Sequence, residues 1–270
     1  MTKSTPKIRG YLARDVFSGV LLYRKSNKLV YLVSLDYKNR KDKVAVGSKF
    51  SGTIYPNRSA LSPDGKDFLY FAMGKGQGDL DKKFYCWTAI CNPPKIKANL
   101  FMPHNTTYSG GGYFIDESNI YIAGGTKAEL SLSKGIDKDK YFGRYKIIFD
   151  PAYNNGRWDS QKYGWIDIEK NKYGFATSWA KANKDHSITK KVKKNWIKSG
   201  EFSMHEYTIT GKKEEALFEQ TDNINWADID NYGRLILCSG SILRIYENYR
   251  PVVSDKPKEF DLEELINGAA

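Results

Sequence analysis

A repeated strand–turn–strand unit constrains the fold of this chain more than any other feature of its sequence. Three clear copies span residues 59–71, 112–122 and 226–237, and weaker copies span 15–23 and 165–175. In each copy, two short runs of apolar residues flank a turn rich in Asp, Asn, Ser or Gly. The turns fall near residues 18, 65, 118, 172 and 233, a mean spacing of about 54 residues. One small sheet cannot bury both of its faces, whereas stacked sheets can.

The repeat therefore predicts an all-β, β-propeller-like fold with five blades, with a pair of β-sandwiches or an irregular β-solenoid as the competing architectures. Aromatic residues make up 14% of the chain, which favours strands. We expect one monomeric domain over residues 1–270. A helix is predicted only at 261–266, where Asp261 and Glu264 form a capping-box pattern and Gly268 follows. Residues 74–83, 125–142 and 180–200 are expected to be long loops.

The turn Ser62-Pro63-Asp64-Gly65-Lys66 resembles the hairpin of TolB-type and WD-repeat-like β-propellers. Residues 60–89, together with 109–114, are also similar to a group of uncharacterised bacterial proteins with a propeller-like pattern. The resemblance implies a fold. It implies no activity and transfers no site residue, because propellers host enzymes, binders and scaffolds alike.

Motifs for metal, nucleotide or nucleophilic chemistry are not found in the sequence. The cysteines Cys86, Cys91 and Cys238 are odd in number, have no histidine nearby and are predicted to be buried thiols. The three histidines, His104, His186 and His205, lie in separate repeat units, and we interpret each as a solvated or core-edge residue. Gly74–Gly78 is read as a flexible loop, because no helix follows it. We expect no metal and no cofactor, and we lean against an enzyme.

Carboxylates and basic residues leave two alternatives open. A glycosidase needs two carboxyl groups in an aromatic pocket, and the candidates are Asp15, Asp64, Asp116, Asp167, Asp228 and Asp230. Most of them occupy predicted turns, where Asp bonds the backbone. The net charge of +12 and the basic loop expected at 190–196 favour a nucleic-acid partner.

The mouth of a propeller channel is the best-placed ligand site, and the residues just before each inner strand would line it. In this chain that set is Tyr11, Arg58, Tyr108, Tyr163, Trp165, Asn225 and Trp226. Aromatic and arginine side chains suit binding hot spots and sugar stacking. We therefore expect a non-catalytic binding or protein-interaction module with a protein partner. The alternatives are a carbohydrate-active or sugar-binding propeller and, third, a nucleic-acid-associated protein.

No apolar segment resembles a secretory signal or a membrane helix. We accordingly expect a cytoplasmic protein without a membrane partner.

Overall fold

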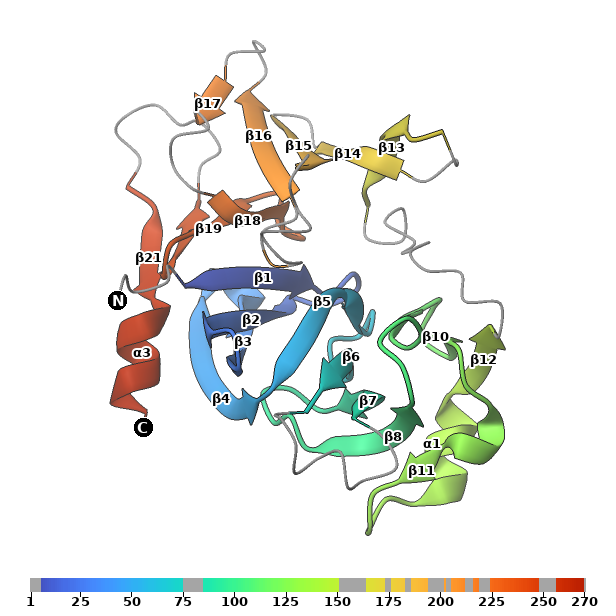
Figure 1. The fold of residues 1–270 in the computed structure, drawn as a ribbon. Helices are drawn as coiled ribbons and strands as arrows, with labels where there is room; N and C mark the ends of the chain where they lie inside the picture. Colours follow the sequence, from blue (N-terminus) through green and yellow to red (C-terminus); the bar gives the residue numbers. More distant parts are fainter. Residues whose placement is uncertain are drawn as a thin grey trace. The chain divides into compact units, whose positions relative to one another are not determined.

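The structure is a computed structural model, and it describes ten stretches of the chain (Figure 1). These are residues 6–74, 85–150, 164–172, 176–182, 186–193, 202, 205–211, 216–218, 224–247 and 256–269. Over these residues the fold is all-β and β-propeller-like, with five small sheets and a short C-terminal helix, as the repeat predicts. The chain divides into two compact units: residues 13–158, and a C-terminal unit made of residues 1–12 and 159–270. The glycine-rich loop at 75–84 and Tyr163 lie outside the described residues.

The 13–158 unit contains three groups of hydrogen-bonded strands. In the first, antiparallel strands follow one another along the chain, namely β2 (Ser18–Ser26), β3 (Leu29–Asp36) and β4 (Lys43–Ser51), with the 3-10 helix η1 (Lys38–Arg40) before β4. The second has the order β11-β8-β7-β6-β5, from β5 (Thr53–Leu61), β6 (Phe68–Met73), β7 (Cys86–Cys91), β8 (Ala98–His104) and β11 (Ser131–Leu132). The third has the order β12-β10-β9, from β9 (Gly112–Phe114), β10 (Asn119–Ala123) and β12 (Lys146–Asp150).

The segment between β10 and β12 is more ordered than the loop expected at 125–142. It contains the 3-10 helix η3 (Lys127–Glu129), strand β11 and the short helix α1 (Lys138–Arg144). Sequence periodicity misses α1 because seven residues are too few to display an apolar stripe. After α1 the chain returns as β12, which pairs with β10 in parallel. This crossover places Arg144 beside the neighbouring hairpin.

The C-terminal unit contains β1 and two sheets. Strand β1 (Lys7–Leu12) contacts β18. One sheet consists of β13 (Ile166–Lys170), β14 (Ala176–Ala182), β15 (His186–Val192), β16 (His205–Gly211) and β17 (Ala216–Phe218), paired antiparallel in chain order. The other consists of β18 (Ile224–Ile229), β19 (Leu235–Ser239), β20 (Ile242–Tyr246) and β21 (Lys258–Asp261), and the helix α3 (Leu262–Gly268) follows it.

The described part of residues 180–200, which is 180–182 and 186–193, differs from the loop that the sequence predicted. It holds the end of β14 and the whole of β15, so Lys190–Val192 of the expected basic loop lie in a strand. The abundance of Lys hid an alternating pattern in which Ile188 and Lys190 share one buried face. Residues 194–196 of that stretch lie outside the described residues.

The predicted turns separate paired strands. Gly65 has a φ of 70°, a value that favours glycine, and its N–H donates to Ser62 O at 2.9 Å. Gly233 repeats this geometry, with a φ of 77° and a bond to Asp230 O at 2.9 Å. The turn near Ser118 joins β9 to β10, and the C-terminal helix begins at its predicted cap, Asp261, which accepts from Glu263 N.

The core follows the central strands of each group. Nearly every side chain of β6, β7 and β19 is buried, whereas β3 and β20 alternate between buried and partly exposed positions. Central strands buried on both faces are expected where sheets stack on one another. All three cysteines are free and buried, as predicted.

Candidate functional site

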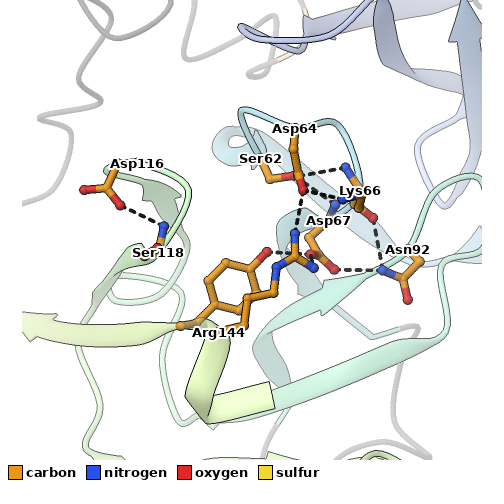
Figure 2. Close-up of polar contacts among 9 residues, drawn as sticks. Ser62, Asp64, Lys66, Asp67, Asn92, Asp116, Ser118 and Arg144 are labelled. Carbon is orange, nitrogen blue, oxygen red and sulfur yellow. Dashed lines mark hydrogen bonds and ion pairs between the residues drawn. The ribbon is translucent and has the colours of Figure 1, made fainter. Parts of the chain in front are cut away.

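The turn after β5 carries the densest polar network of the described structure. Figure 2 shows the guanidinium of Arg144, from α1, between two carboxylates of this turn. It lies 2.7 Å from Asp64 Oδ2 and 2.8 Å from Asp67 Oδ2. Tyr145 donates to Asp67 Oδ2 at 2.5 Å, and Asn92 donates to Asp67 Oδ1 at 2.7 Å. Both oxygens of Asp67 are therefore occupied.

The surroundings of the two carboxylates shift their pKa values in opposite directions. Burial raises the pKa of Asp67, although Tyr145 and Arg144 oppose the shift. Burial acts in the same direction on Asp64, but hydrogen bonds from Ser62 and Lys66 outweigh it and lower the pKa. A carboxylate pair bonded in this way holds the hairpin to α1.

Two other candidate carboxylates also bond their own turns. Asp116 Oδ1 accepts from the N–H groups of Ser118 and Asn119, each at 2.8 Å. Asp230 Oδ1 accepts from the N–H groups of Tyr232 and Arg234, at 2.9 and 2.8 Å. The turn role predicted for these residues is thus confirmed, and it explains why Asp recurs in the repeat.

Arg58 and Tyr108, two of the residues expected at the channel mouth, lie close together in the 13–158 unit. Arg58 Nη1 donates to Thr107 O at 2.6 Å, directly before Tyr108. Tyr108 is 75% exposed, the highest value among the large hydrophobic residues described. We call Arg58, Thr107 and Tyr108 the Tyr108 surface.

The backbone on either side fixes this surface. Residues 56–59 form a bulge in β5, because Tyr55 pairs with Phe71 and Ala60 pairs with Leu69. The guanidinium of Arg58 lies over the rings of Phe71 and Tyr55, at 5.2 and 5.5 Å from their centroids. The arginine is therefore held by stacking as well as by its hydrogen bond.

Gly111 packs directly against Arg58 and is bonded to a buried polar pair. Its φ is 86°, and a Cβ at this position would lie 2.7 Å from the carbonyl oxygen of Arg58. Gly111 N donates to Thr88 Oγ1 at 2.7 Å, and Thr88 Oγ1 lies 2.8 Å from His104 Nε2. Burial lowers the pKa of His104 to about 4, so the ring is neutral at pH 7. His104 is thus a buried structural residue and not a solvated one.

A second cluster lies on one face of the β13–β17 sheet, in the C-terminal unit. The register places Trp179, Lys190 and Tyr207 side by side on β14, β15 and β16. Lys190 Nζ lies 3.9 Å from the ring centroid of Trp165 and 5.2 Å from that of Trp179. Lys190 is 8% exposed and Trp165 is 4% exposed. The ammonium group is therefore buried between two indole rings.

Strand β1 adds Arg9 to this cluster. Arg9 Nη1 lies 3.0 Å from His205 Nδ1 and donates to Tyr207 Oη at 2.9 Å. Burial, reinforced by the charge of Arg9, lowers the pKa of both His205 and Lys190 well below their ordinary values. Lys181, two residues from Trp179 on β14, pairs with buried Asp228 at 2.6 Å. We call Arg9, Lys181, Lys190 and His205, with the rings of Trp165, Trp179 and Tyr207, the cationic face.

The remaining residues of the predicted mouth lie in the C-terminal unit. Tyr11 on β1 and Asn225 on β18 are partly exposed. Trp226 is buried, and its ring packs so closely on Gly10 that a Cβ there would lie 2.5 Å from it. Trp165 belongs to the cationic face. Sequence reasoning missed Arg9 and the burial of Lys190, although the alternation in residues 186–192 carried that signal.

The described residues contain no group of three or more His, Cys, Asp or Glu that could hold a metal ion. The same part of the chain has no helix long and apolar enough to cross a membrane.

No protein-family model and no curated protein matches this sequence. Among solved structures, the chain is similar to the uncharacterized protein lmo1340 from Listeria monocytogenes EGD-e, with 11% identity and a TM-score of 0.31. The similarity covers 92% of this chain and 60% of that protein, so the chain spans less than two thirds of that protein's length. The name of that protein states no function.

Proposed function

We propose that this protein is a non-catalytic binding module that recognises a protein partner through the Tyr108 surface. The observation that carries the proposal is the 75% exposure of Tyr108 on a backbone held by Arg58. Tyrosine and arginine are the residue types most enriched in interface hot spots, together with tryptophan. A tyrosine presented on a fixed backbone loses little conformational entropy when it binds.

The other polar clusters of the 13–158 unit support a binding role over a catalytic one. Asp64 and Asp67 share the guanidinium of Arg144, and His104 is neutral at pH 7 and bonded to Thr88. Their charges and lone pairs are used within the fold. We also propose that the chain is related to TolB-type bacterial propellers, on the strength of the Ser62–Lys66 turn.

A comparative pull-down tests the proposal. Tagged wild-type protein, Tyr108→Ala and Ile166→Ala would each be incubated with lysate of the source cell, with and without nuclease treatment, and the recovered proteins quantified by mass spectrometry. Ile166 is the control because it is also a large exposed side chain, at 68%, but lies on β13 of the C-terminal unit. We expect a stoichiometric protein that wild type and Ile166→Ala recover and that Tyr108→Ala loses.

Three outcomes would contradict the proposal. Equal recovery by all three proteins would show that Tyr108 is not the anchor. Material lost only on nuclease treatment would point to nucleic acid, and its binding should then weaken steeply with salt. Glycan binding that depends on Tyr108, with no recovered protein, would point to the sugar-binding alternative.

A further inference from the structure

The cationic face contains two basic residues, buried Lys190 and partly exposed Arg9, that form no ion pair with a carboxylate of the described residues. The ammonium group of Lys190 lies over two indole rings, and Asp228 and Asp167 act on it only through their charge, without a hydrogen bond or ion pair. Arg9 bonds to the side chains of His205 and Tyr207. Arg9 Nε is buried and has no hydrogen-bond partner within the described part of the chain. Each of these two side chains therefore keeps a donor that no described residue satisfies.

The nearby carboxylates do not neutralise these two groups. Asp228 Oδ1 already accepts from Lys181 Nζ at 2.6 Å and from Ile229 N at 2.8 Å. Asp167, across from Trp179 on β13, is paired with Lys170 at 3.8 Å. Burial without a partner disfavours the charged form of a lysine, which lowers the pKa of Lys190, and a bound anion would favour that charge again.

We propose that the cationic face is a binding site for a phosphate group, which Arg9 and Lys190 hold together. A guanidinium presents its N–H donors in a planar fork that suits phosphate oxygens, and an ammonium adds a compact point charge. Two uncompensated cations match the two negative charges of a phosphate monoester better than the single charge of a carboxylate.

Burial of the cluster decides what kind of phosphate can enter. Lys190, His205, Tyr207 and Trp165 are each at most 8% exposed, whereas Arg9, Trp179 and Lys181 are partly exposed. Arg9 Nε is buried and Lys190 is 8% exposed, so a ligand would have to enter past the partly exposed side chains of Arg9, Trp179 and Lys181, and only a small terminal group could do so. An internal phosphodiester of a nucleic acid carries a chain on both sides and one charge, so it fits this site poorly. The ligand class is therefore a small molecule with a terminal phosphate, or inorganic phosphate.

Titration with inorganic phosphate tests this site, with intrinsic tryptophan fluorescence as the readout because Trp165 and Trp179 flank Lys190. Sodium chloride at matched ionic strength separates binding from charge screening. The test variant is Lys190→Met, which keeps the length of the side chain and removes the charge. The control is Lys191→Met on the opposite face of the same strand, where Lys191 is exposed and pairs with Glu169 at 3.1 Å.

We expect saturable phosphate binding by wild type and by Lys191→Met, and roughly 10- to 100-fold weaker binding by Lys190→Met, the loss typical of a charge-assisted hydrogen bond. Arg9→Gln should show a similar loss, and circular dichroism would establish that each variant is folded. A wild-type protein that responds to phosphate no more than to chloride would overturn the proposal. So would equal affinity in Lys190→Met and Lys191→Met.

A glucose 6-phosphate titration beside inorganic phosphate separates the two sources of the group. Tighter binding of the ester would indicate a phosphorylated metabolite, and tighter binding of the inorganic ion would indicate free phosphate. Either result supports the site. Because the Tyr108 surface belongs to the other unit, Tyr108→Ala should leave phosphate affinity unchanged, and each proposal can fail without the other.

Discussion

His104 shows at the scale of one residue how burial turns a titratable group into a structural one. Its Nε2 meets the hydroxyl of Thr88, which also accepts the N–H of Gly111. The ring is buried beside these groups, and burial disfavours its charged form. Protonation of His104 therefore opposes the folded state around Gly111, which packs against Arg58.

Folding stability should depend on pH through this histidine. The pKa of His104 is about 4 in the folded protein, against an ordinary value of 6.5. Between these values the unfolded chain binds more protons, so the free energy of unfolding falls as the pH drops from 6.5 to 4, by about 3 kcal/mol for this group. Urea unfolding of wild type and His104→Gln across this range measures the difference.

His205 also contributes to acid sensitivity, because its pKa is lowered too, but its contribution is common to both proteins. The difference between the two curves isolates His104. Parallel curves for wild type and His104→Gln would show that this ring does not control acid stability.

Some residue roles can be predicted from sequence and others cannot. The turn carboxylates are predictable, because Asp in a tight turn bonds the backbone of that turn wherever it lies in the fold. The burial of Lys190 could have been predicted, because Lys190 lies two residues after Ile188 and therefore on the same face of the strand. The partners of Arg9 were not, because His205 and Tyr207 lie almost two hundred positions away in the sequence.

At the scale of elements, the loop after β8 is positioned by contact with the bulge of β5. Gly111→Ala should destabilise the protein by about 2 kcal/mol, because the new Cβ meets the backbone of Arg58 and the backbone conformation favours glycine. Thermal unfolding measures the loss.

Gly135→Ala is the matched control for this substitution. Gly135 has a similar φ of 90°, but a Cβ there would meet nothing within 4 Å. It should lose only the conformational part of the effect, roughly 1 kcal/mol. Equal losses in the two variants would mean that contact with Arg58 contributes nothing.

A second prediction concerns α1, which Arg144 joins to the β5–β6 turn (Figure 2). Arg144→Met leaves Asp67, with a side chain only 2% exposed, without its cation and should cost about 1–3 kcal/mol in unfolding free energy. Arg14→Met removes an exposed ion pair with Asp15 and should cost less than about 0.5 kcal/mol. Urea unfolding of both variants decides the matter, and a loss for Arg144→Met no larger than for Arg14→Met would contradict it.

Strands were predictable as elements, whereas their connections were not. The apolar runs that form β6, β7, β19 and β20 are visible in the sequence because each is short and bounded by turn residues. Strand β15 was missed because lysines at exposed and buried positions look alike in the sequence. Strand β12 depends on its pairing with β10, and helix α1 depends on the contacts of Arg144 with the β5–β6 turn. No local sequence pattern encodes either contact.

At the scale of the molecule, the sequence predicted one domain and the contacts define two compact units. Lys190→Met should stabilise the C-terminal unit by about 1–3 kcal/mol, because a methionine of similar volume removes a buried charge. If residues 1–270 form one cooperative domain, as we expect, the free energy of unfolding should rise equally in both units. Native-state hydrogen exchange would then show equal gains for the slowest amides of β19 and β7.

A gain confined to β19 would establish two units that unfold separately. No gain in either strand would show instead that Lys190 is not a destabilising charge, and that the pairing of its ammonium with Trp165 and Trp179 offsets its burial.

The turn carboxylates also set the order of events during folding. Asp64, Asp116 and Asp230 each close a hairpin between strands adjacent in sequence, and such hairpins form in about 1–10 μs. The parallel pairing of β12 with β10 must wait for a long loop to close around α1. We therefore expect the hairpins to form before β12 pairs with β10. We expect Arg144 to meet Asp64 and Asp67 late, after the hairpins have formed. Removing these ion pairs, as in Arg144→Met, should then speed unfolding and leave the folding rate almost unchanged.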